Sequence, residues 1–407
     1  MEKRGDVVIL NILVQNPFMR SGGAENRIRT LLQALVKRPD IDEVHFMFSG
    51  PEAHHQVEAG GKFHYWQIRK NHTKSVTENI LRDYDIDVVQ LHNNQIIGVE
   101  GIKLAQEKGI PTVWLMHDFW CVCHQRFLTK VWEADFTDLC YEINPQKCLD
   151  CVGAYNYLCT KREREVVQNC DVGIVPSERI RNIFYNVDFM KDKMIIVKPW
   201  IDLSLFKPIP EKAKKPYQVL YASGNFIPHK GINVLLRAWE LVNRRLPEAN
   251  LIAIGDQRSL RETVDLSKKL KLQNINLIQR VEQDKLKEIY YESALTIFPS
   301  IWEETIGLVW IESLAVGTPV ICSATGSIPE LLKEGGEMFE PRNHVELAST
   351  ILDLLLSPSK RAKLAVAGNR YVHSEFRPER AADDFTKIYY RLEGENYEKN
   401  IKEKIEE

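Results

Sequence analysis

Short runs of apolar residues alternate along the chain with longer segments that carry apolar residues at helical spacing. The short runs are rich in Val, Ile and Leu, which is typical of strands buried on both faces of a parallel sheet. They predict strands at 7–14, 43–48, 63–68, 86–91, 111–116, 171–175 and 194–197, and a second series at 217–222, 250–254, 275–279, 294–298 and 319–322. The periodic segments predict helices, among them 24–36, 98–108, 233–245 and 284–292.

The alternation of strand and helix predicts an α/β fold with two Rossmann-like parallel-sheet domains. A stretch rich in Pro and Lys at 199–216 predicts a linker between an N-terminal domain, 1–198, and a C-terminal domain, 217–380. The remainder, 381–407, predicts C-terminal helices and a charged tail. Ligands of such sheets bind at the carboxyl ends of the strands, so functional residues are expected in the turns that follow strands.

Composition excludes several classes of protein. The 407 residues carry 54 Lys and Arg against 56 Asp and Glu, so no global basic field exists to bind nucleic acid. No apolar run reaches the length that spans a bilayer, about 20 residues. The apolar segment at 7–14 is short and contains Asn11, which favours a buried strand over a signal peptide. Eight cysteines in 407 residues are no disulfide framework, so we expect a cytoplasmic protein.

Two glycines follow the first predicted strand. Gly22 and Gly23 lack side chains, so a ligand can approach the backbone closely, and a helix is expected to begin directly after them. The free N–H groups of a helix N-terminus favour an anion such as a diphosphate. A simple tight turn is the alternative, and the pattern is not the glycine fingerprint of dinucleotide-binding dehydrogenases.

A lysine occupies the equivalent turn of the second half. Lys230 and Gly231 follow the predicted strand 217–222 and precede a helical pattern. A lysine at this place can reach phosphate oxygens at the carboxyl edge of the sheet. An ordinary surface lysine is the alternative.

The segment after the predicted strand 294–298 carries two glutamates. Glu304 and Glu312 are eight residues apart with Gly307 between them. In a helix this separation is about 12 Å, enough for one carboxylate to hold a sugar and the other a ribose. The N–H groups from Ile306 to Leu308 would then face the phosphates. The alternative is a capped amphipathic helix with acidic residues near its start.

Together these motifs resemble glycosyltransferase family 4, the retaining enzymes with the GT-B fold also called glycosyl transferases group 1. The resemblance extends over about 7–392 and rests on four motifs in order: GGAE, KG before a helix, PS-x-x-E-E-x-x-G-L-x-x-x-E-S-L-A-x-G-T-P-V, and G-x-x-P-E. It implies an N-terminal acceptor-binding domain, a C-terminal donor-binding domain and a C-terminal helix that returns to the N-terminal domain.

The resemblance also implies a reaction and its residues. The family moves a sugar from a nucleotide-diphosphate sugar with retention of configuration and needs no catalytic divalent metal. By position, Gly23 lies near the diphosphate, Lys230 pairs with it, Glu304 contacts the donor sugar and Glu312 the ribose. The remaining matches are His117 beside the reacting sugar, Gly307 and Leu308 with backbone N–H groups toward phosphate and sugar, and Gly326 and Glu330 with structural roles.

One position departs from the family. An arginine usually stands a few residues before the lysine, where this chain has Asn225. Arg280, followed by Val281, stands where the family often has glycine, near the segment that contacts the base. The charge contact is then either missing or supplied by another residue, for which Arg280 is the candidate.

Seven of the eight cysteines lie between positions 121 and 170. Cys148 and Cys151 form a C-x-x-C pair, and Cys123 and Cys140 complete a set of four thiolates for a structural zinc in an insertion at about 119–160. An iron–sulfur cluster and thiols or disulfides are alternatives. Cys121, His124 and Cys159 are competing ligands.

The partners that this interpretation implies are a nucleotide sugar and a glycan or lipid-linked acceptor, the latter with peripheral contact at the cytosolic membrane face. Two other functions stay open. One is a nucleotide-sugar epimerase, and the other is a zinc-bearing interaction protein on a degenerate transferase scaffold. The motifs do not specify the base, the sugar, the acceptor or the oligomeric state.

Overall fold

The computed structural model describes residues 7–12, 23–48, 63–68, 72–92, 98–125, 128, 140, 144–209, 213–256 and 259–406. The side chains of 7–12, Asn225 and 395–406 are outside this description, as is Gly22 entirely. The chain forms two compact units. Unit 1 contains the described residues up to Leu128, Cys140–Trp200 and the chain from Pro378 onward, and unit 2 contains Ile201–Arg377.

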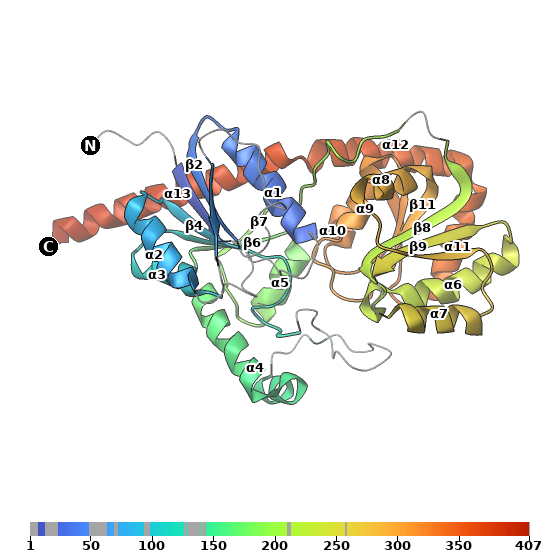
Figure 1. Cartoon of the computed structure of the whole chain (residues 1–407), viewed down its shortest axis with the longest axis horizontal. Helices are drawn as coiled ribbons and strands as arrows, with labels where there is room; N and C mark the ends of the chain where they lie inside the picture. Colours follow the sequence, from blue (N-terminus) through green and yellow to red (C-terminus); the bar gives the residue numbers. More distant parts are fainter. Residues whose placement is uncertain are drawn as a thin grey trace. The chain divides into compact units, whose positions relative to one another are not determined.

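Unit 1 is built on a parallel sheet of seven strands in the order β3-β2-β1-β4-β5-β6-β7. Figure 1 labels β2, β4, β6 and β7 of this sheet. Its strands are β1 Val7–Ile12, β2 Ile41–Phe48, β3 Phe63–Gln67, β4 Val88–Leu91, β5 Thr112–Leu115, β6 Val172–Val175 and β7 Met194–Ile196. Its helices are α1 Gly23–Val36, α2 Thr73–Asp83, α3 Glu100–Glu107, α4 Pro145–Gln168, α5 Glu178–Asn186 and α13 Pro378–Glu406.

Unit 2 is built on a parallel sheet of six strands in the order β10-β9-β8-β11-β12-β13. Its strands are β8 Lys215–Asn225, β9 Asn250–Asp256, β10 Ile275–Gln279, β11 Ser293–Phe298, β12 Val320–Ser323 and β13 Gly336–Phe339. Its helices are the 3₁₀ turn η3 Pro228–Lys230, α6 Ile232–Arg245, α7 Leu260–Lys269, α8 Gln283–Glu292, α9 Leu308–Ala315, α10 Ile328–Leu331, α11 His344–Leu356 and α12 Pro358–Glu375.

Alternate side chains of the strands feed two separate cores in unit 2. Val219 and Tyr221 of β8 pack with α6 and α11, whereas Leu220 and Ala222 pack on the opposite face with α8, α9 and α12. This alternation follows from the two-residue period of a strand. It explains why the strands read as continuous apolar runs, and it fixes the sheet so that the turns after β8, β11 and β12 lie at one edge.

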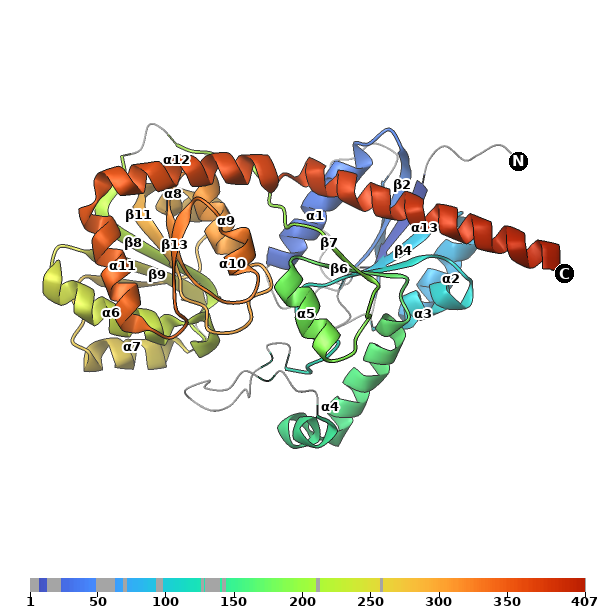
Figure 2. The ribbon, with the colours of Figure 1, turned by 180° about the vertical axis from the view of Figure 1, so that it is seen from behind.

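The C-terminal helix α13 belongs to unit 1, as the family resemblance implies. It lies beside α1 on one face of the sheet, where Phe385 and Tyr389 join the core that α1 forms with the strands (Figure 2). Arg380 holds its start by donating to the carbonyls of Lys198 and Pro199 at 2.7 and 3.3 Å. The α/β architecture with two parallel sheets is therefore confirmed.

The pattern analysis omitted some elements. The short strand β13 begins at Gly336 and follows Gly335, so its apolar run is too short to stand out. The helix α4 occupies much of the cysteine-rich segment, with Asn144 capping its N-terminus and a break at Gly153. No helix in the described residues is long and apolar enough to cross a membrane.

Candidate active site

The predicted donor residues of unit 2 lie in turns that follow adjacent strands. Strands β8, β11 and β12 are neighbours in the sheet, so their carboxyl ends meet at the same edge. The turn after β8 carries Lys230, the turn after β11 carries Glu304, and the turn after β12 carries Gly326. Sequence spacing alone does not bring these three together, but the strand order does.

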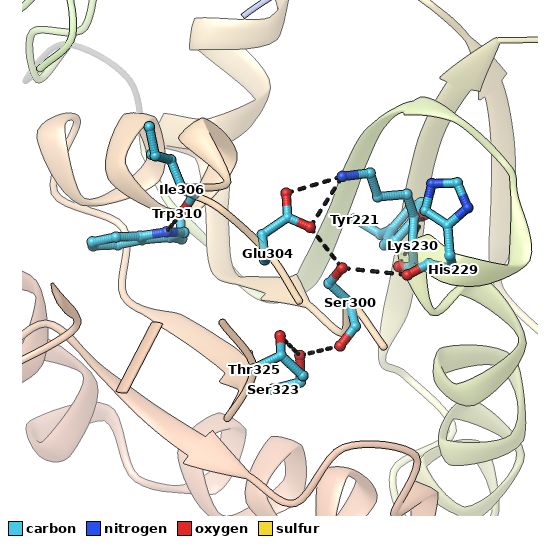
Figure 3. A network of polar contacts seen from close by, with 9 residues as sticks. All are labelled: Tyr221, His229, Lys230, Ser300, Glu304, Ile306, Trp310, Ser323 and Thr325. Carbon is cyan, nitrogen blue, oxygen red and sulfur yellow. Dashed lines mark hydrogen bonds and ion pairs between the residues drawn. The ribbon is translucent and has the colours of Figure 1, made fainter. Parts of the chain in front are cut away.

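Lys230 and Glu304 form a close ion pair (Figure 3). The Lys230 Nζ lies 3.0 and 3.1 Å from the two carboxylate oxygens of Glu304. The Glu304 side chain is 5% exposed and the Lys230 side chain 23% exposed. At this distance and an effective dielectric constant near 20, the attraction is about 5 kcal/mol before desolvation. The two residues expected to contact opposite parts of a donor thus neutralise one another in this structure.

Backbone and hydroxyl groups hold the pair in place. The Ser300 hydroxyl donates to Glu304 Oε2 at 2.8 Å (Figure 3). The amide of Ile301 donates to the carbonyl of His229 at 2.9 Å. The ring of Trp302 lies under the ammonium, with its centroid 4.9 Å from Lys230 Nζ. Burial, and then the charge of Lys230, lower the pKa of His229 to about 3, so this imidazole is neutral. These contacts hold one cation and one carboxylate in place at the ends of the two strands.

Two glycines permit the close approach of these turns. Gly231, between η3 and α6, has φ of 75°, and a Cβ there would lie 1.7 Å from the carbonyl oxygen of Pro299. Gly326 has φ of 53°, and a Cβ there would lie 1.9 Å from the carbonyl oxygen of Glu304. The Gly326 amide also donates to Glu303 Oε2 at 3.0 Å. Any larger residue would push the Glu304 turn out of position.

Glu312 lies in α9, one turn beyond its N-terminus. Its Oε2 accepts a hydrogen bond of 3.0 Å from the hydroxyl of Tyr290 in α8. Burial raises the pKa of Glu312 to about 7, although the Tyr290 hydroxyl acts in the opposite direction. A carboxyl poised near neutrality can accept or donate a hydrogen bond, depending on the ligand.

The other predicted donor residues lie around this edge. Gly307 is the residue before α9, and Leu308 is the first residue of the helix. The carbonyl of Ile306 accepts from the indole N–H of Trp310 at 2.7 Å. Asn225 ends β8. Arg280 is exposed and Val281 partly buried, in the turn between β10 and α8, and the role of Arg280 stays a prediction.

A chain of polar side chains in unit 1 leads to His117. The Tyr389 hydroxyl donates to Gln90 Oε1 at 2.7 Å, the Gln90 amide lies 2.9 Å from His92 Nε2, and His92 Nδ1 lies 3.3 Å from His117 Nε2. The amide nitrogen of Gln90 can only donate, so His92 accepts at Nε2 and carries its proton on Nδ1. His117 then accepts at Nε2 and carries its own proton on Nδ1. This series of hydrogen bonds therefore assigns the tautomer of His117.

Both imidazoles are neutral. Burial lowers the pKa of His117 well below its usual range, with the charge of Arg27 and the proximity of His92 as lesser causes. Burial and then Arg27 lower the pKa of His92 to about 3. His117 therefore offers a fixed N–H donor at the carboxyl edge of the unit 1 sheet and not a cation.

The four cysteines predicted as zinc ligands are all described. Cys148 and Cys151 lie in the first two turns of α4, and Cys123 and Cys140 precede the helix. Burial raises the pKa of the Cys148 thiol, and the neighbouring Cys140 and Cys151 add to the effect. Among the described residues the eight cysteines form no disulfide. No three of their sulfur atoms lie within 4.8 Å of one another in the described part of the chain, so the zinc site stays a prediction.

A different cluster, which the sequence analysis did not single out, joins Glu43, His45 and His64 on β2 and β3. Its hydrogen bonds argue against a metal. Trp66 Nε1 donates to His45 Nδ1 at 3.2 Å, so neutral His45 carries its proton on Nε2, which faces Glu43 Oε2 at 3.2 Å. The rings of His45 and His64 stack with centroids 4.5 Å apart. The cluster is therefore explained by ring stacking and hydrogen bonds between side chains of the two strands at this edge of the sheet.

Sequence reasoning missed the residues behind His117, namely Arg27, Gln90, His92 and Tyr389. A signal for two of them existed. In the run VVQLHNN, Gln90 and His92 are polar residues two apart at the end of a buried strand, which places both on one face. Nothing local marks Tyr389, because it lies 299 residues away from Gln90 and reaches it only through the return of α13.

Two family models cover most of the chain. The model described as Glycosyltransferase Family 4 matches residues 21–205, and the model described as Glycosyl transferases group 1 matches residues 205–371. Their boundary falls beside the boundary between the two units at Trp200 and Ile201.

Relatives and solved structures agree with these matches. A "GDP-mannose-dependent monoacylated alpha-(1-6)-phosphatidylinositol monomannoside mannosyltransferase" of Corynebacterium glutamicum is 29% identical over 181 residues, 42% of this chain and 46% of that protein. The match spans about half the length of the first curated relatives.

Two solved structures share the fold. Sucrose-phosphate synthase from Thermosynechococcus elongatus has a TM-score of 0.71 at 20% identity and covers 95% of this chain and 99% of its own. Anabaena Alr3699/HepE in complex with UDP and glucose has a TM-score of 0.71 at 16% identity, covering 95% of this chain and 100% of its own. With its paired parallel sheets, this chain has the GT-B fold and belongs to glycosyltransferase family 4, the glycosyl transferases group 1.

Proposed function

We propose that this protein is a retaining glycosyltransferase that moves a sugar from a nucleotide-diphosphate sugar to a glycan or lipid-linked acceptor. The observation that carries the proposal is the Lys230–Glu304 pair, mounted where the turns after β8 and β11 meet. A cation and a carboxylate side by side match a donor that presents a diphosphate next to sugar hydroxyls.

Donor binding redistributes the contacts of this pair. A diphosphate brings negative charge to Lys230, whose ammonium then moves from Glu304 to the phosphate oxygens. The carboxylate of Glu304 accepts hydrogen bonds from the sugar hydroxyls, and Ser300 keeps it oriented. Because Glu304 is almost fully buried, releasing it from Lys230 is favourable only when hydroxyl donors replace the ammonium.

In the reaction, the bond between the anomeric carbon and the diphosphate breaks as the acceptor oxygen attacks from the same face. The acceptor proton passes to the leaving phosphate oxygen, so the products are the glycoside and the nucleoside diphosphate. Lys230 and the N–H groups at the start of α9 stabilise the charge that develops on the diphosphate. No resident metal is needed for this step, because the ammonium supplies the positive charge.

Glu312 and His117 complete the proposed roles. Ionised Glu312 accepts from the ribose hydroxyls. His117 donates through Nδ1–H to a hydroxyl of the reacting sugar or the acceptor, and the chain through His92, Gln90 and Tyr389 fixes the donor in that tautomer.

The relatives support the substrate classes. Alr3699/HepE binds UDP and glucose, and the corynebacterial relative depends on GDP-mannose and acts on a phosphatidylinositol mannoside. These names describe donors that are nucleotide sugars and, in one case, a lipid acceptor. They favour transfer over the epimerase and the scaffold protein.

The test is turnover of a panel of nucleotide sugars with glycan and lipid-linked acceptors, followed by proton NMR of the product. We expect release of one nucleoside diphosphate and a product whose anomeric coupling equals that of the donor. An inverted product would refute the retaining mechanism. Binding of donors without release of nucleotide in any combination would instead support the scaffold protein.

A further inference from the structure

Arg27 lies on the buried face of α1 in unit 1 and is 5% exposed. Its guanidinium stacks on Trp200, with the Cζ 4.2 Å from the ring centroid. The same indole donates from Nε1 to the carbonyl of Arg27 at 2.8 Å. Trp200 therefore holds both the backbone and the side chain of this arginine in place.

Among the described residues, no carboxylate forms an ion pair with Arg27. In the described residues no Asp or Glu oxygen lies within 4.0 Å of it, and its Nε is fully buried without a hydrogen-bond partner there. The segments that follow β1 and β4 in the sequence, 13–22 and 93–97, contain no acidic residue. Burial lowers the pKa of Arg27 to about 9, so it stays charged at neutral pH.

The neighbours of Arg27 are the two neutral imidazoles of the site. Its charge contributes to lowering the pKa of both His92 and His117. The guanidinium thus lies beside two neutral hydrogen-bonding rings at the carboxyl ends of β4 and β5. A buried unpaired charge is strongly unfavourable unless something compensates it. The atom left without a partner, Nε, is one of the N–H donors of a guanidinium, whose fork geometry matches phosphate oxygens.

We propose that Arg27 binds a phosphate group of a substrate in unit 1, next to His117. Arg27 retains an exposed fraction of 5%, and its Nε has no hydrogen-bond partner among the described residues, so a phosphate at this edge of the sheet finds a donor that is not already used. The ligand chemistry is that of a phosphate group, carried either by a nucleotide or by a phosphorylated acceptor. The placement among substrates rests on the proposed function, but phosphate binding itself is measured without turnover.

A purely structural role makes a different prediction. If Arg27 only packs on Trp200, Arg27→Met keeps much of the packing, removes the uncompensated charge and leaves every affinity unchanged. If Arg27 binds phosphate, the same substitution keeps or raises the melting temperature and weakens phosphate binding. Arg29→Met is the matched control, because it removes an equal charge from the same helix at a partly exposed position.

The experiment is isothermal titration of the full chain and its variants with UDP, GDP, ADP, uridine and inorganic phosphate. We expect Arg27→Met, but not Arg29→Met, to weaken phosphate-containing ligands about tenfold or more. If Arg27→Met loses affinity for the nucleoside diphosphate that the wild type binds but not for the corresponding nucleoside, the phosphate that Arg27 binds belongs to the nucleotide donor. Unchanged nucleotide affinity, with loss of inorganic phosphate binding at saturating nucleotide, identifies an acceptor phosphate.

Equal affinities of Arg27→Met and the wild type for every phosphate ligand would overturn the proposal and leave the glycosyltransferase function standing. Absence of nucleotide binding, together with phosphate binding that depends on Arg27, would support the phosphate site and contradict the proposed glycosyltransferase function. If Arg27→Met does not fold, Arg27→Lys provides the comparison, because it keeps the charge but lacks the planar fork. Unchanged phosphate affinity in a folded Arg27→Lys would refute recognition by the guanidinium fork.

Discussion

Glu312 provides a quantitative test of the donor site. Its carboxyl has an ordinary pKa of 4.5, which burial raises to about 7 in the folded chain. A pKa difference of one corresponds to about 1.4 kcal/mol, so the two values correspond to about 3 kcal/mol. Because the folded pKa is the higher one, the neutral carboxyl stabilises the fold. This contribution is fully present below pH 4.5 and is lost as the pH rises through about 7.

Glu312→Gln keeps the shape of the side chain and cannot ionise. We expect the free energy of unfolding of the variant, relative to the wild type, to rise by about 3 kcal/mol between pH 4.5 and pH 8. Urea unfolding of the variant and the wild type at several fixed pH values measures this difference in free energy. The relevant unfolding transition is the one whose midpoint the substitution changes. Glu334→Gln is the control, because Glu334 is exposed in the same unit. A pH-independent difference between Glu312→Gln and the wild type would refute the assigned burial.

The same carboxyl makes donor affinity depend on pH. If ribose hydroxyls bind the ionised form, nucleotide affinity rises with the ionised fraction, by about tenfold between pH 6 and pH 8 for a pKa near 7. Glu312→Gln should abolish this dependence and bind weakly at both pH values. Calorimetric titration with the nucleotide that the protein binds measures both effects. A wild-type affinity that does not change over this range would contradict the ribose role.

Three further changes test other parts of the site. Gly326→Ala should destabilise unit 2 by more than about 2 kcal/mol in thermal unfolding, because its Cβ would lie 1.9 Å from a backbone oxygen. The control Gly317→Ala, with φ of 80° and open space around the new Cβ, should cost only about 1 kcal/mol. Lys230→Met should destabilise by about 2 kcal/mol or more by leaving a buried carboxylate unpaired, and adding Glu304→Gln should restore most of that loss while activity stays absent. Tyr389→Phe should lower kcat with little change in donor KM, because without the hydroxyl the hydrogen bonds from Gln90 through His92 no longer fix the tautomer of His117. A fall in donor affinity as large as the fall in kcat would indicate a structural role for Tyr389.

The zinc prediction has its own test. Metal analysis of protein purified without chelator should give close to one zinc per chain, and Cys148→Ser with Cys151→Ser should remove it. A content below about 0.2 per chain would exclude the structural zinc site. Iron with visible absorption would favour the iron–sulfur alternative.

How much the sequence predicts differs between the two units. In unit 2 each motif follows a strongly apolar strand, so the positions of Lys230, Glu304 and Gly326 at one edge follow from strand order. The ion pair itself could not be predicted, because it depends on how closely Gly231 and Gly326 let the turns approach. Sequence analysis treated the two charges as separate contacts to a ligand, and the structure shows them joined.

In unit 1 the site depends on contacts that no local pattern contains. His117 was found through the family resemblance, but its tautomer comes from Gln90 and His92 and, beyond them, from Tyr389 in the returning helix. Arg27 reads in the sequence as one charged residue in an amphipathic helix. Its burial against Trp200, with no ion pair to a carboxylate of the described residues, is visible only in the folded structure.

The central claim is that Lys230 binds the diphosphate of a nucleotide sugar. The most direct measurement is the shift in melting temperature of the wild type, Lys230→Met and the matched control Lys269→Met with UDP, GDP and ADP. At a ligand concentration of 100 times Kd, the wild type should gain about 2.7 kcal/mol with one of these nucleotides. We expect Lys269→Met to keep this shift and Lys230→Met to lose most of it. An equal shift in Lys230→Met, or no shift of the wild type with any of the three, would contradict the claim.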